Sequence, residues 1–333
     1  MARKILILGG TGTIGSAVTR ALLEQGEDVT LLLREGRIPP SGVKAVTADG
    51  NDEEALVAIQ REGAYDIVIN LLIYTAEQAQ MNLRVFPDVR QLIFISTVCV
   101  NDRAETVVFT EKSPCGNRES VYGQHKQEAE LVFLAAAEKG YPVTIVRPTQ
   151  TYGGQKLPLS VKGKSYWGIC QRILDGKPVI VHGDGTSVWI STYCDDFAAG
   201  LLPLIGRKEA LGEIFQITSD EALTWDQMYQ ILGEELGRAP KIVHIPTDVL
   251  VQAGLGGGIR GDKESSVLFD NHKLKTLTGF VPKVSFREGV RKYLAGIEKH
   301  PEWKKTDPAF DQKCDAVCAA WNEMTRDFSE LFS

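Results

Sequence analysis

Short runs of Ile, Leu and Val alternate with segments of helical length along the first half of the chain. Continuous apolar runs of this kind are typical of strands that are covered on both faces. The predicted strands are residues 5–8, 29–33, 43–46, 67–72, 92–95 and 143–146. Between the first two, apolar residues from Ile14 to Leu22 have the spacing of an amphipathic helix, which ends at Gly26. The repeated unit predicts an α/β fold with a doubly wound parallel sheet, the Rossmann fold, whose ligands bind at the carboxyl ends of the strands.

The alternation ends near Gly153, and the second half of the chain has a looser pattern. A capping box at residues 224–227 predicts the start of a helix there. We therefore predict one domain over residues 1–153. A smaller, mixed α/β C-terminal lobe is predicted mainly over residues 154–295, with some segments that return to the first domain, and residues 296–333 are predicted to form a helical tail.

The composition is that of an ordinary folded protein, with 43% hydrophobic and 24% charged residues among 333. Charges of both signs are interspersed and sum to −6, so nucleic acid is not an expected partner. No apolar run is long enough to span a membrane, and the N-terminus leads straight into the first strand, so we expect no membrane contact and no targeting segment. The 6 cysteines lack the spacing of a metal site, which favours free thiols, a cytoplasmic protein and no metal. Cys314 and Cys318 share a helical face and are interpreted as a packing stripe.

A glycine-rich turn follows the first predicted strand and opens the first helix. Glycine lets a backbone turn tightly and lie close to a pyrophosphate, and a helix N-terminus offers unpaired N–H groups to that anion. The alternative is a turn that needs glycine for packing alone. We predict a dinucleotide site, which makes residues 1–153 the dinucleotide-binding domain and residues 154–295 the substrate lobe. Its residues in this turn are Gly9, Thr11, Gly12, Thr13, Ile14 and Gly15.

Two positions bear on which dinucleotide is bound. Arg34 ends the second predicted strand, where proteins that prefer NAD usually carry an acidic residue for the ribose 2′-hydroxyl. An arginine there favours a 2′-phosphate, and so NADP over NAD, while a solvated loop charge is the competing interpretation. After the third strand, Asp49 is placed to reach the adenine ring, and a helix cap by Asn51 or Asp52 is equally compatible with this segment.

Tyr122 and Lys126 stand at the predicted start of a helix, where a separation of four residues places both on one face. A tyrosine hydroxyl has a pKa of about 10 in water, so acid/base chemistry at neutral pH requires a nearby cation such as a lysine. A second Tyr-x-x-x-Lys pattern, from Tyr152 to Lys156, contains two glycines and is predicted to be a loop without a fixed helical face. Only the first pair has the geometry for catalysis.

A hydroxyl pair, Ser96 and Thr97, follows the fifth predicted strand at the carboxyl edge of the sheet. Thr97 is placed to hydrogen-bond a substrate oxygen, and Ser96 is its close rival for that role. A strand-end Ser or Thr more commonly forms a turn, so the assignment depends on Tyr122 nearby.

These motifs are followed by Arg147-Pro148 after the sixth strand, Gly183-Asp184-Gly185, Asp195-Asp196 and the stretch 270–289. Together they resemble the extended short-chain dehydrogenase/reductase family, in particular its NAD-dependent epimerase/dehydratase branch, up to about residue 295. The resemblance implies that Tyr122 is the acid/base, that Lys126 binds the nicotinamide ribose and lowers the tyrosine pKa, and that Thr97 orients the reacting oxygen. We expect further cofactor contacts from Gly50, Leu71 and Pro148, and substrate contacts from Ser96, Thr97, Thr151 and Trp189.

The chain departs from the family pattern at positions that bear on the substrate. Sugar-nucleotide enzymes of the family usually place an arginine four residues after Gly-Asp-Gly, and here that position is Trp189. Nucleotide 4,6-dehydratases carry Asp-Glu directly after the catalytic threonine, where this chain has Val98-Cys99, so dehydration is disfavoured. These departures, together with Arg34, indicate a divergent member of the branch.

The leading hypothesis is hydride transfer between NAD(P) and a secondary alcohol or ketone of a sugar-like small molecule. Arg34 and the missing diphosphate arginine favour a reductase, whereas the resemblance over nearly the whole chain favours an epimerase, and the choice stays open. A non-catalytic NAD(P)-sensing or RNA-binding protein on the same scaffold is the alternative. The resemblance also implies a homodimer, paired through the helix near Tyr122 and the helix near residues 76–86.

Overall fold

The computed structural model describes residues 2–104 and 106–330, and the chain divides into two compact units. The first unit comprises Met1–Tyr152, Thr192–Asp220 and Phe269–Lys283, and the second comprises Gly153–Ser191, Glu221–Leu268 and Val284–Ser333. None of the described helices combines the length and the apolar character that crossing a membrane requires.

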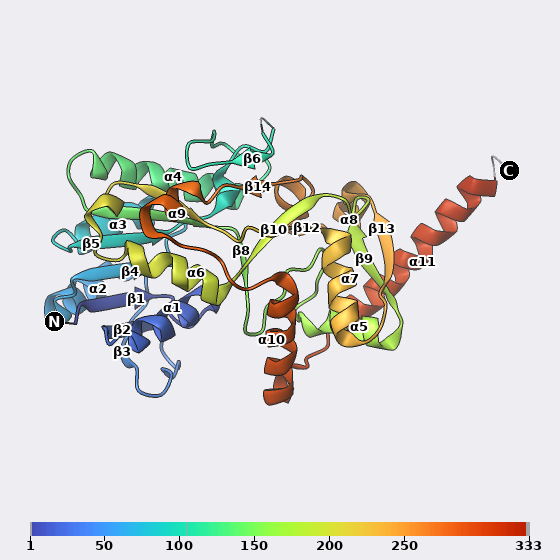
Figure 1. The fold of residues 1–333 in the computed structure, drawn as a ribbon, viewed down its shortest axis with the longest axis horizontal. Coiled ribbons are helices and arrows are strands. Elements are labelled where there is room, and N and C mark those ends of the chain that lie inside the picture. Colours follow the sequence, from blue (N-terminus) through green and yellow to red (C-terminus); the bar gives the residue numbers. More distant parts are fainter. Residues whose placement is uncertain (1, 105, 331–333) are drawn as a thin grey trace. The chain divides into compact units, whose positions relative to one another are not determined.

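A seven-stranded sheet forms the centre of the first unit (Figure 1). Its strands, in spatial order, are β11 (Ile214–Ile217), β7 (Val143–Pro148), β5 (Gln91–Ile95), β4 (Ile67–Asn70), β1 (Lys4–Leu8), β2 (Asp28–Leu33) and β3 (Lys44–Thr47). All neighbouring strands are parallel, and the chain order reverses between β1 and β4. That reversal is the mark of a doubly wound sheet, and it confirms the predicted α/β fold class.

Two strands of this sheet differ from the pattern in the sequence. The apolar run 67–72 predicts a longer fourth strand, but β4 ends at Asn70. The Asn70 side chain accepts a hydrogen bond from the Leu72 backbone N–H at 2.8 Å, and this turns the chain away from the sheet. The edge strand β11 is not predicted, because its four residues include the polar Gln216.

Helices cover both faces of the sheet: α1 (Thr13–Glu24), α2 (Glu53–Gly63), α3 (Ala76–Val85), α4 (Val121–Ala137) and α6 (Cys194–Leu201). The side chains of Asp52, Thr75 and Ser120 accept hydrogen bonds from backbone N–H groups in the first turns of α2, α3 and α4, and so fix where these helices begin. The inward sides of α2, α3 and α4 share one apolar core with the sheet, which includes Leu56 and Phe133. Helices α1 and α6 pack against each other.

The second unit is a mixed α/β structure. In it β9 (Pro178–His182) and β13 (Lys241–Ile245) form a parallel pair, and the start of β10 (Val188–Tyr193) pairs antiparallel with β12 (Ala222–Thr224). Its helices are α5 (Trp167–Asp175), α7 (Trp225–Leu236), α8 (Thr247–Gln252), α10 (Phe286–Lys299) and α11 (Pro308–Glu330). The predicted capping box is present, since Thr224 and Gln227 exchange hydrogen bonds at the start of α7. The other short strands are β6 (Val108–Phe109), β8 (Gln150–Tyr152) and β14 (Leu268–Phe269), and α9 (His272–Thr278) is a further short helix.

The long helix α11 is held on the second unit by buried thiols and by ion pairs. Cys314 and Cys318 are each 2% exposed and pack in an apolar core of this unit, which confirms their interpretation as a packing stripe. Arg172 of α5, also 2% exposed, donates to Asp311 at 2.5 Å and to Asp315 at 2.7 Å. The first turns of α11 are therefore anchored by one buried cation.

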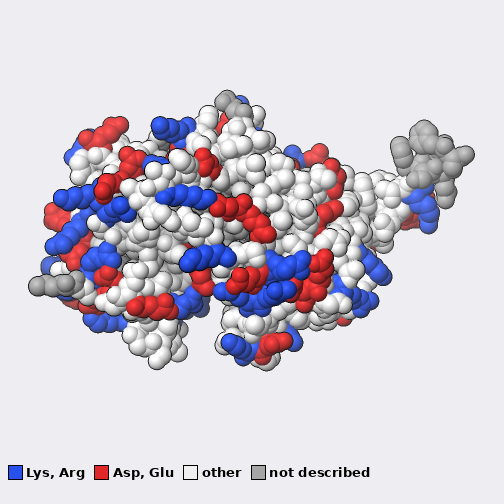
Figure 2. Space-filling view, in the orientation of Figure 1, with Lys and Arg blue, Asp and Glu red and all other residues white. Residues whose placement is uncertain are grey.

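Acidic and basic side chains are interspersed over the face of the molecule in Figure 2. The 6 cysteines are free thiols. In the described part of the chain, no group of His, Cys, Asp and Glu residues is arranged to hold a metal ion.

Candidate active site

The glycine turn lies between β1 and α1, with Gly12 as the N-cap residue of the helix. Gly9 has a φ of +90°, which disfavours a side chain there. A Cβ atom on Gly15 would lie 2.2 Å from the Gly9 carbonyl oxygen, so packing alone requires glycine at that position. Gly12 is different, because its φ is −76° and its nearest neighbour would be 3.7 Å from a Cβ atom. The packing interpretation therefore explains Gly15, whereas Gly12 has room for a side chain.

The start of α1 is suited to an anion. No side chain caps the helix, and its first turn contains no acidic residue. Its first N–H groups consequently point out of the helix end with the positive end of the helix dipole behind them. Thr11 and Gly12 are exposed, while Thr13 and Ile14 are half-buried. These residues fit the pyrophosphate of a dinucleotide.

The other positions predicted for the cofactor follow the carboxyl ends of neighbouring strands. Arg34 is exposed directly after β2. Asp49 is exposed and accepts a hydrogen bond from the Asn51 N–H at 2.8 Å, while Asp52 caps α2, so the cap alternative holds for Asp52. Gly50 is half-buried beyond β3. Leu71 and Pro148 stand at the ends of β4 and β7, with Leu71 N–H bonded to the carbonyl of the last residue of β1.

Tyr122 and Lys126 lie in the first two turns of α4, as the sequence predicts. Tyr122 is 46% exposed and Lys126 is 1% exposed, and the Lys126 Nζ atom lies 5.8 Å from the centroid of the Tyr122 ring. The second Tyr-x-x-x-Lys pattern has no such geometry, because Tyr152 is buried at the end of β8 and a turn follows it.

The Lys126 side chain is held by two backbone carbonyls, one in the loop that follows β4 and one at the end of β5. Its Nζ donates to the Ile73 oxygen at 2.6 Å and to the Ile95 oxygen at 2.9 Å. Burial lowers the pKa of Lys126 to about 7, and the nearby Glu130 carboxylate opposes that shift. The ammonium is therefore partly deprotonated near neutral pH, and a hydrogen-bond acceptor brought close to it would favour the charged form.

One short segment links the glycine turn to Lys126. A Cβ atom on Gly9 would lie 3.1 Å from Leu71 and Leu72, and the next residue, Ile73, carries the carbonyl that binds Lys126. The glycine turn and the Tyr122–Lys126 pair are thus neighbours at the same edge of the sheet, within one unit.

Thr97 and Ser96 follow β5 beside this pair but differ in their contacts. Thr97 is 6% exposed, and its Oγ1 accepts a hydrogen bond from the Cys99 N–H at 3.1 Å, which starts a short turn. Ser96 is 2% exposed, and its Oγ donates to Glu130 Oε1 at 2.5 Å. The turn-forming interpretation thus holds for Thr97 alongside any catalytic role. The Ser96 hydroxyl is bonded to Glu130 inside the protein, which does not favour the predicted substrate contact by Ser96.

The structure also brings residues to the site that sequence reasoning missed. Tyr74 lies in the loop between β4 and α3. The centroid of its ring is 4.7 Å from Lys126 Nζ and 6.5 Å from the centroid of the Tyr122 ring. Glu130 and Arg147 form a buried ion pair next to Ser96. A signal for Glu130 existed, since it lies four residues after Lys126 on the same helical face.

Thr151 and Trp189 are the other two residues predicted to contact the substrate. Thr151 is half-buried in β8, and its hydroxyl donates to the Thr149 carbonyl at 3.1 Å. Trp189 belongs to the second unit, where it is 2% exposed and packs against Trp225 with the rings tilted and their centroids 5.9 Å apart. Its predicted role in substrate binding stays a prediction.

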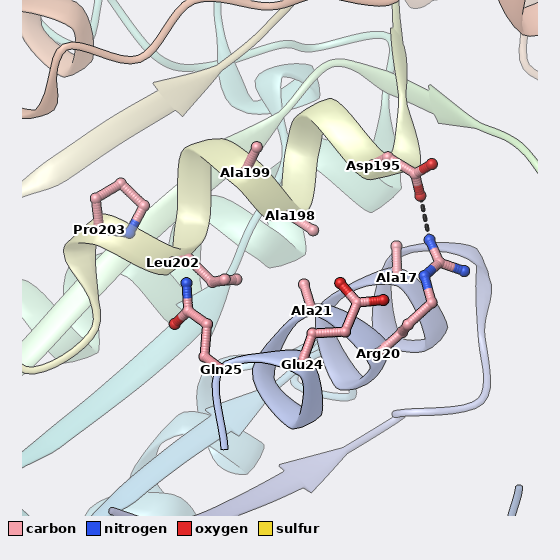
Figure 3. Close-up of a pocket in the computed structure, with 10 residues that line it drawn as sticks. All are labelled: Ala17, Arg20, Ala21, Glu24, Gln25, Asp195, Ala198, Ala199, Leu202 and Pro203. Carbon is pink, nitrogen blue, oxygen red and sulfur yellow. Dashed lines mark hydrogen bonds and ion pairs between the residues drawn. The ribbon is translucent and has the colours of Figure 1, made fainter. Parts of the chain in front are cut away.

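A surface groove of about 830 Å³ runs between α1 and α6, and Figure 3 shows the residues that line it. Arg20 and Asp195 form an ion pair across one end of it. The groove contains none of the residues predicted for cofactor or substrate, so it is not part of the candidate site.

The sequence pattern of the NAD-dependent epimerase/dehydratase family matches residues 5–218. The chain belongs to this family. It is 28% identical over 250 residues to 2′-dehydrokanamycin reductase from Streptomyces kanamyceticus, covering 74% of this chain and 70% of that protein. It is 26% identical over 259 residues to the chloroplast stem-loop binding protein of 41 kDa b from Arabidopsis thaliana, covering 73% of this chain and 66% of that protein.

The fold is also similar to that of a solved epimerase structure. The UDP-glucuronic acid 4-epimerase from Bacillus cereus, determined in complex with UDP-glucuronic acid and NAD, superposes with a TM-score of 0.72 at 20% identity. The match covers 89% of this chain and 99% of that protein. The same arrangement of sheet and helices is therefore present in both proteins.

Proposed function

We propose that this protein is an NAD(P)-dependent oxidoreductase or epimerase that acts on a secondary alcohol or ketone of a sugar-like substrate, with Tyr122 as the acid/base. One observation carries the proposal: a half-exposed Tyr122 and a buried Lys126 share a helical face at the strand ends that also carry the glycine turn. Both the reductase and the epimerase among its relatives and structural neighbours support this class of reaction.

The residues of the chain have separate tasks in this reaction. The α1 N-terminus binds the pyrophosphate, and the exposed cation of Arg34 after β2 supports a preference for the 2′-phosphate of NADP. The bound dinucleotide supplies or accepts the hydride. Lys126, in its ammonium form, hydrogen-bonds the nicotinamide ribose and stabilises the tyrosinate form of Tyr122. Tyr122 exchanges its hydroxyl proton with the substrate oxygen, and Thr97 holds that oxygen.

An epimerase and a reductase differ in whether the cofactor stays bound between turnovers. An epimerase oxidises and then reduces the same carbon and keeps its NAD, whereas a reductase exchanges the cofactor in each turnover. Arg34 and Trp189 support a reductase, and likeness to an epimerase over 89% of the chain supports the other choice. That dehydration is disfavoured rests on Val98-Cys99 and stays a prediction.

The first experiment is to denature freshly purified protein and identify any released nicotinamide nucleotide by mass spectrometry. Retained NAD supports the epimerase cycle and contradicts the role of Arg34. An empty site that then binds NADPH more tightly than NADH supports the reductase. A protein that neither retains nor binds either nucleotide rules out the proposed function.

A second candidate function is cofactor sensing or RNA binding without catalysis, and the likeness to a chloroplast stem-loop binding protein favours it. The proposed function requires Tyr122 for turnover, and this alternative does not. Binding of a labelled RNA stem-loop, measured beside binding of NADH, separates the two functions. RNA binding without any NAD(P)-dependent turnover would establish the alternative.

A further inference from the structure

Glu130 is a buried carboxylate on the same face of α4 as Tyr122 and Lys126, one helical turn further along. It is 2% exposed, and its oxygens accept three hydrogen bonds. Arg147 of β7 donates to Glu130 Oε1 from Nε at 2.9 Å and to Oε2 from Nη2 at 2.5 Å. Ser96 donates to Oε1 at 2.5 Å. The ion pair and the hydroxyl therefore join α4 to the ends of β5 and β7.

A buried ion pair contributes little net free energy to the stability of a protein core. The loss of hydration commonly equals or exceeds the mutual attraction, and apolar residues of similar volume often do as well. Arg147 is 2% exposed, and its Nη1 has no hydrogen-bond partner among the described residues. Stability alone thus gives little reason for these two charges at this place.

The contacts of the pair converge on the catalytic residues. Ser96, held by Glu130, directly precedes Thr97, and Ile95, the residue before Ser96, offers the carbonyl that binds Lys126. The Glu130 carboxylate and the Lys126 ammonium lie within mutual electrostatic influence. The pair is thus coupled to Lys126 in two ways, through the β5 end and through its charge.

We propose that the Glu130–Arg147 ion pair is a positioning element of the catalytic site, which fixes the end of β5 and favours the charged form of Lys126. This inference rests on the proposed function, because it assigns the pair a task only where Lys126 serves cofactor and tyrosine. Glu130 supplies the negative charge near Lys126. Arg147 partly neutralises that charge and, through its two hydrogen bonds, fixes the position of the carboxylate.

The charged and titratable groups that face Lys126 determine in which direction the loss of Glu130 shifts the titration of Lys126. They are Tyr122 and Glu130 on α4, Tyr74 from the β4 loop, and, beyond Glu130, Arg147 of β7 with Cys115 3.3 Å from its Nη2. Burial raises the pKa of the Cys115 thiol, so this group is uncharged at neutral pH. Glu130 is then the anion that favours the Lys126 ammonium, and its removal leaves the Arg147 cation uncompensated.

The test follows the titration of Lys126 by NMR in protein labelled with [ε-¹³C]lysine, with the resonance assigned through K126Q. In the cofactor-free parent protein, the midpoint should lie at about 7. In E130Q we expect it to fall by about one pH unit or more, because an attractive charge is lost while burial persists. A purely structural role would leave the midpoint unmoved, or raise it as the site loosens and admits water. Either result overturns the proposal.

A double variant covers the case in which E130Q does not fold. E130Q/R147M removes both charges, and we expect its Lys126 midpoint to lie between those of E130Q and the parent. A midpoint above the parent's overturns the proposal. The matched control is E128Q, an exposed glutamate on the same helix, whose Lys126 midpoint should equal that of the parent.

A second readout connects the titration to the cofactor. NADH affinity, followed by its fluorescence between pH 6 and pH 9, should weaken in the parent as Lys126 loses its proton, and in E130Q this weakening should begin at lower pH. Affinity profiles that coincide in the two proteins contradict the positioning role. A parent protein that binds no nicotinamide nucleotide refutes the proposed function, whereas the NMR midpoints still report whether the ion pair controls the charge of Lys126.

Discussion

At the scale of single residues, the proposed catalytic pair, Tyr122 and Lys126, combines an accessible hydroxyl with an inaccessible amine. Tyr122 is 46% exposed and Lys126 is 1% exposed, although the two are one helical turn apart. The helix start turns Tyr122 toward solvent, and two backbone carbonyls hold Lys126 inside. One turn of helix thereby presents a hydroxyl to solvent and holds an amine in a fixed position behind it, as the proposed mechanism requires.

Replacement of Tyr122 by phenylalanine should abolish most turnover and leave cofactor binding intact. In the proposed mechanism the lost hydroxyl is the proton donor, and general acid/base groups contribute about 10²- to 10⁴-fold to rate. The measurement is NAD(P)H oxidation with a panel of keto sugars, beside the NAD(P)H dissociation constant. Because Tyr122 is half-exposed, stability should change by less than about 0.5 kcal/mol. An active Y122F enzyme would contradict the assigned role.

Lys126 should destabilise the protein at neutral pH and do so less at high pH. Its pKa is about 7 in the folded state against 10.5 for an ordinary lysine. Between these values the unfolded state binds more protons, so stability rises with pH. The stability advantage of K126M over the parent should therefore shrink by about 1–3 kcal/mol from pH 7 to pH 9, measured by urea unfolding. K139M, which removes an exposed lysine, should show no such trend.

At the scale of elements, we expect Gly15 and Gly12 of the β1–α1 turn to have different roles, Gly15 in packing and Gly12 in nucleotide binding. Gly15 has no room for a side chain, and Gly12 has room. We expect G15A to lose about 1–3 kcal/mol of unfolding free energy through the forced shift of the β1–α1 turn. G12A should lose about 1 kcal/mol or less and yet bind NAD(P)H at least about tenfold more weakly, because its methyl group occupies the approach to the helix N-terminus. Unchanged nucleotide affinity in folded G12A would leave the turn without its proposed ligand.

Most elements of the first unit could be predicted from local pattern, because continuous apolar runs and helix spacing report burial directly. The pairing of Tyr122 with Lys126 was predictable for the same reason, since helical spacing alone places both on one face. The contacts of Glu130 and Arg147 were not, because they join residues far apart in the sequence through three-dimensional packing. Likewise β4 ends at Asn70 through a side-chain hydrogen bond that an apolar run does not reveal.

At the scale of the whole molecule, the buried side chain of Arg172 helps to hold the long helix α11 on the second unit. Arg172 is 2% exposed and binds both Asp311 and Asp315, while Lys177, 37% exposed, binds the same two carboxylates. We expect R172M to lose about 1–3 kcal/mol of unfolding free energy and to speed proteolysis before α11. K177M should have a smaller effect, because an exposed ion pair contributes at most about 1 kcal/mol. Equal sensitivity in the two variants would contradict this.

The outer side of α4 bears on whether two chains associate. Val121 and Leu131 are 64% and 58% exposed there, and α3 packs alongside α4. A stable dimer buries about 800 Å² per partner, and large apolar side chains at the centre of such a contact contribute most of its affinity. We predict a homodimer, seen by sedimentation at micromolar concentration as twice the 36.6 kDa chain mass.

In this dimer, a charge at Leu131 would be buried without a partner, so L131E should dissociate it at concentrations where the parent stays paired. V281E changes an apolar side chain of similar exposure, 60%, outside α4 and should remain dimeric. A parent protein that sediments as a monomer would contradict the pairing. Dissociation by V281E but not by L131E would place the interface elsewhere. Because α4 also carries Tyr122 and Lys126, a dimer through this helix would stiffen the element that holds the catalytic pair, and L131E should then lower turnover as well as mass.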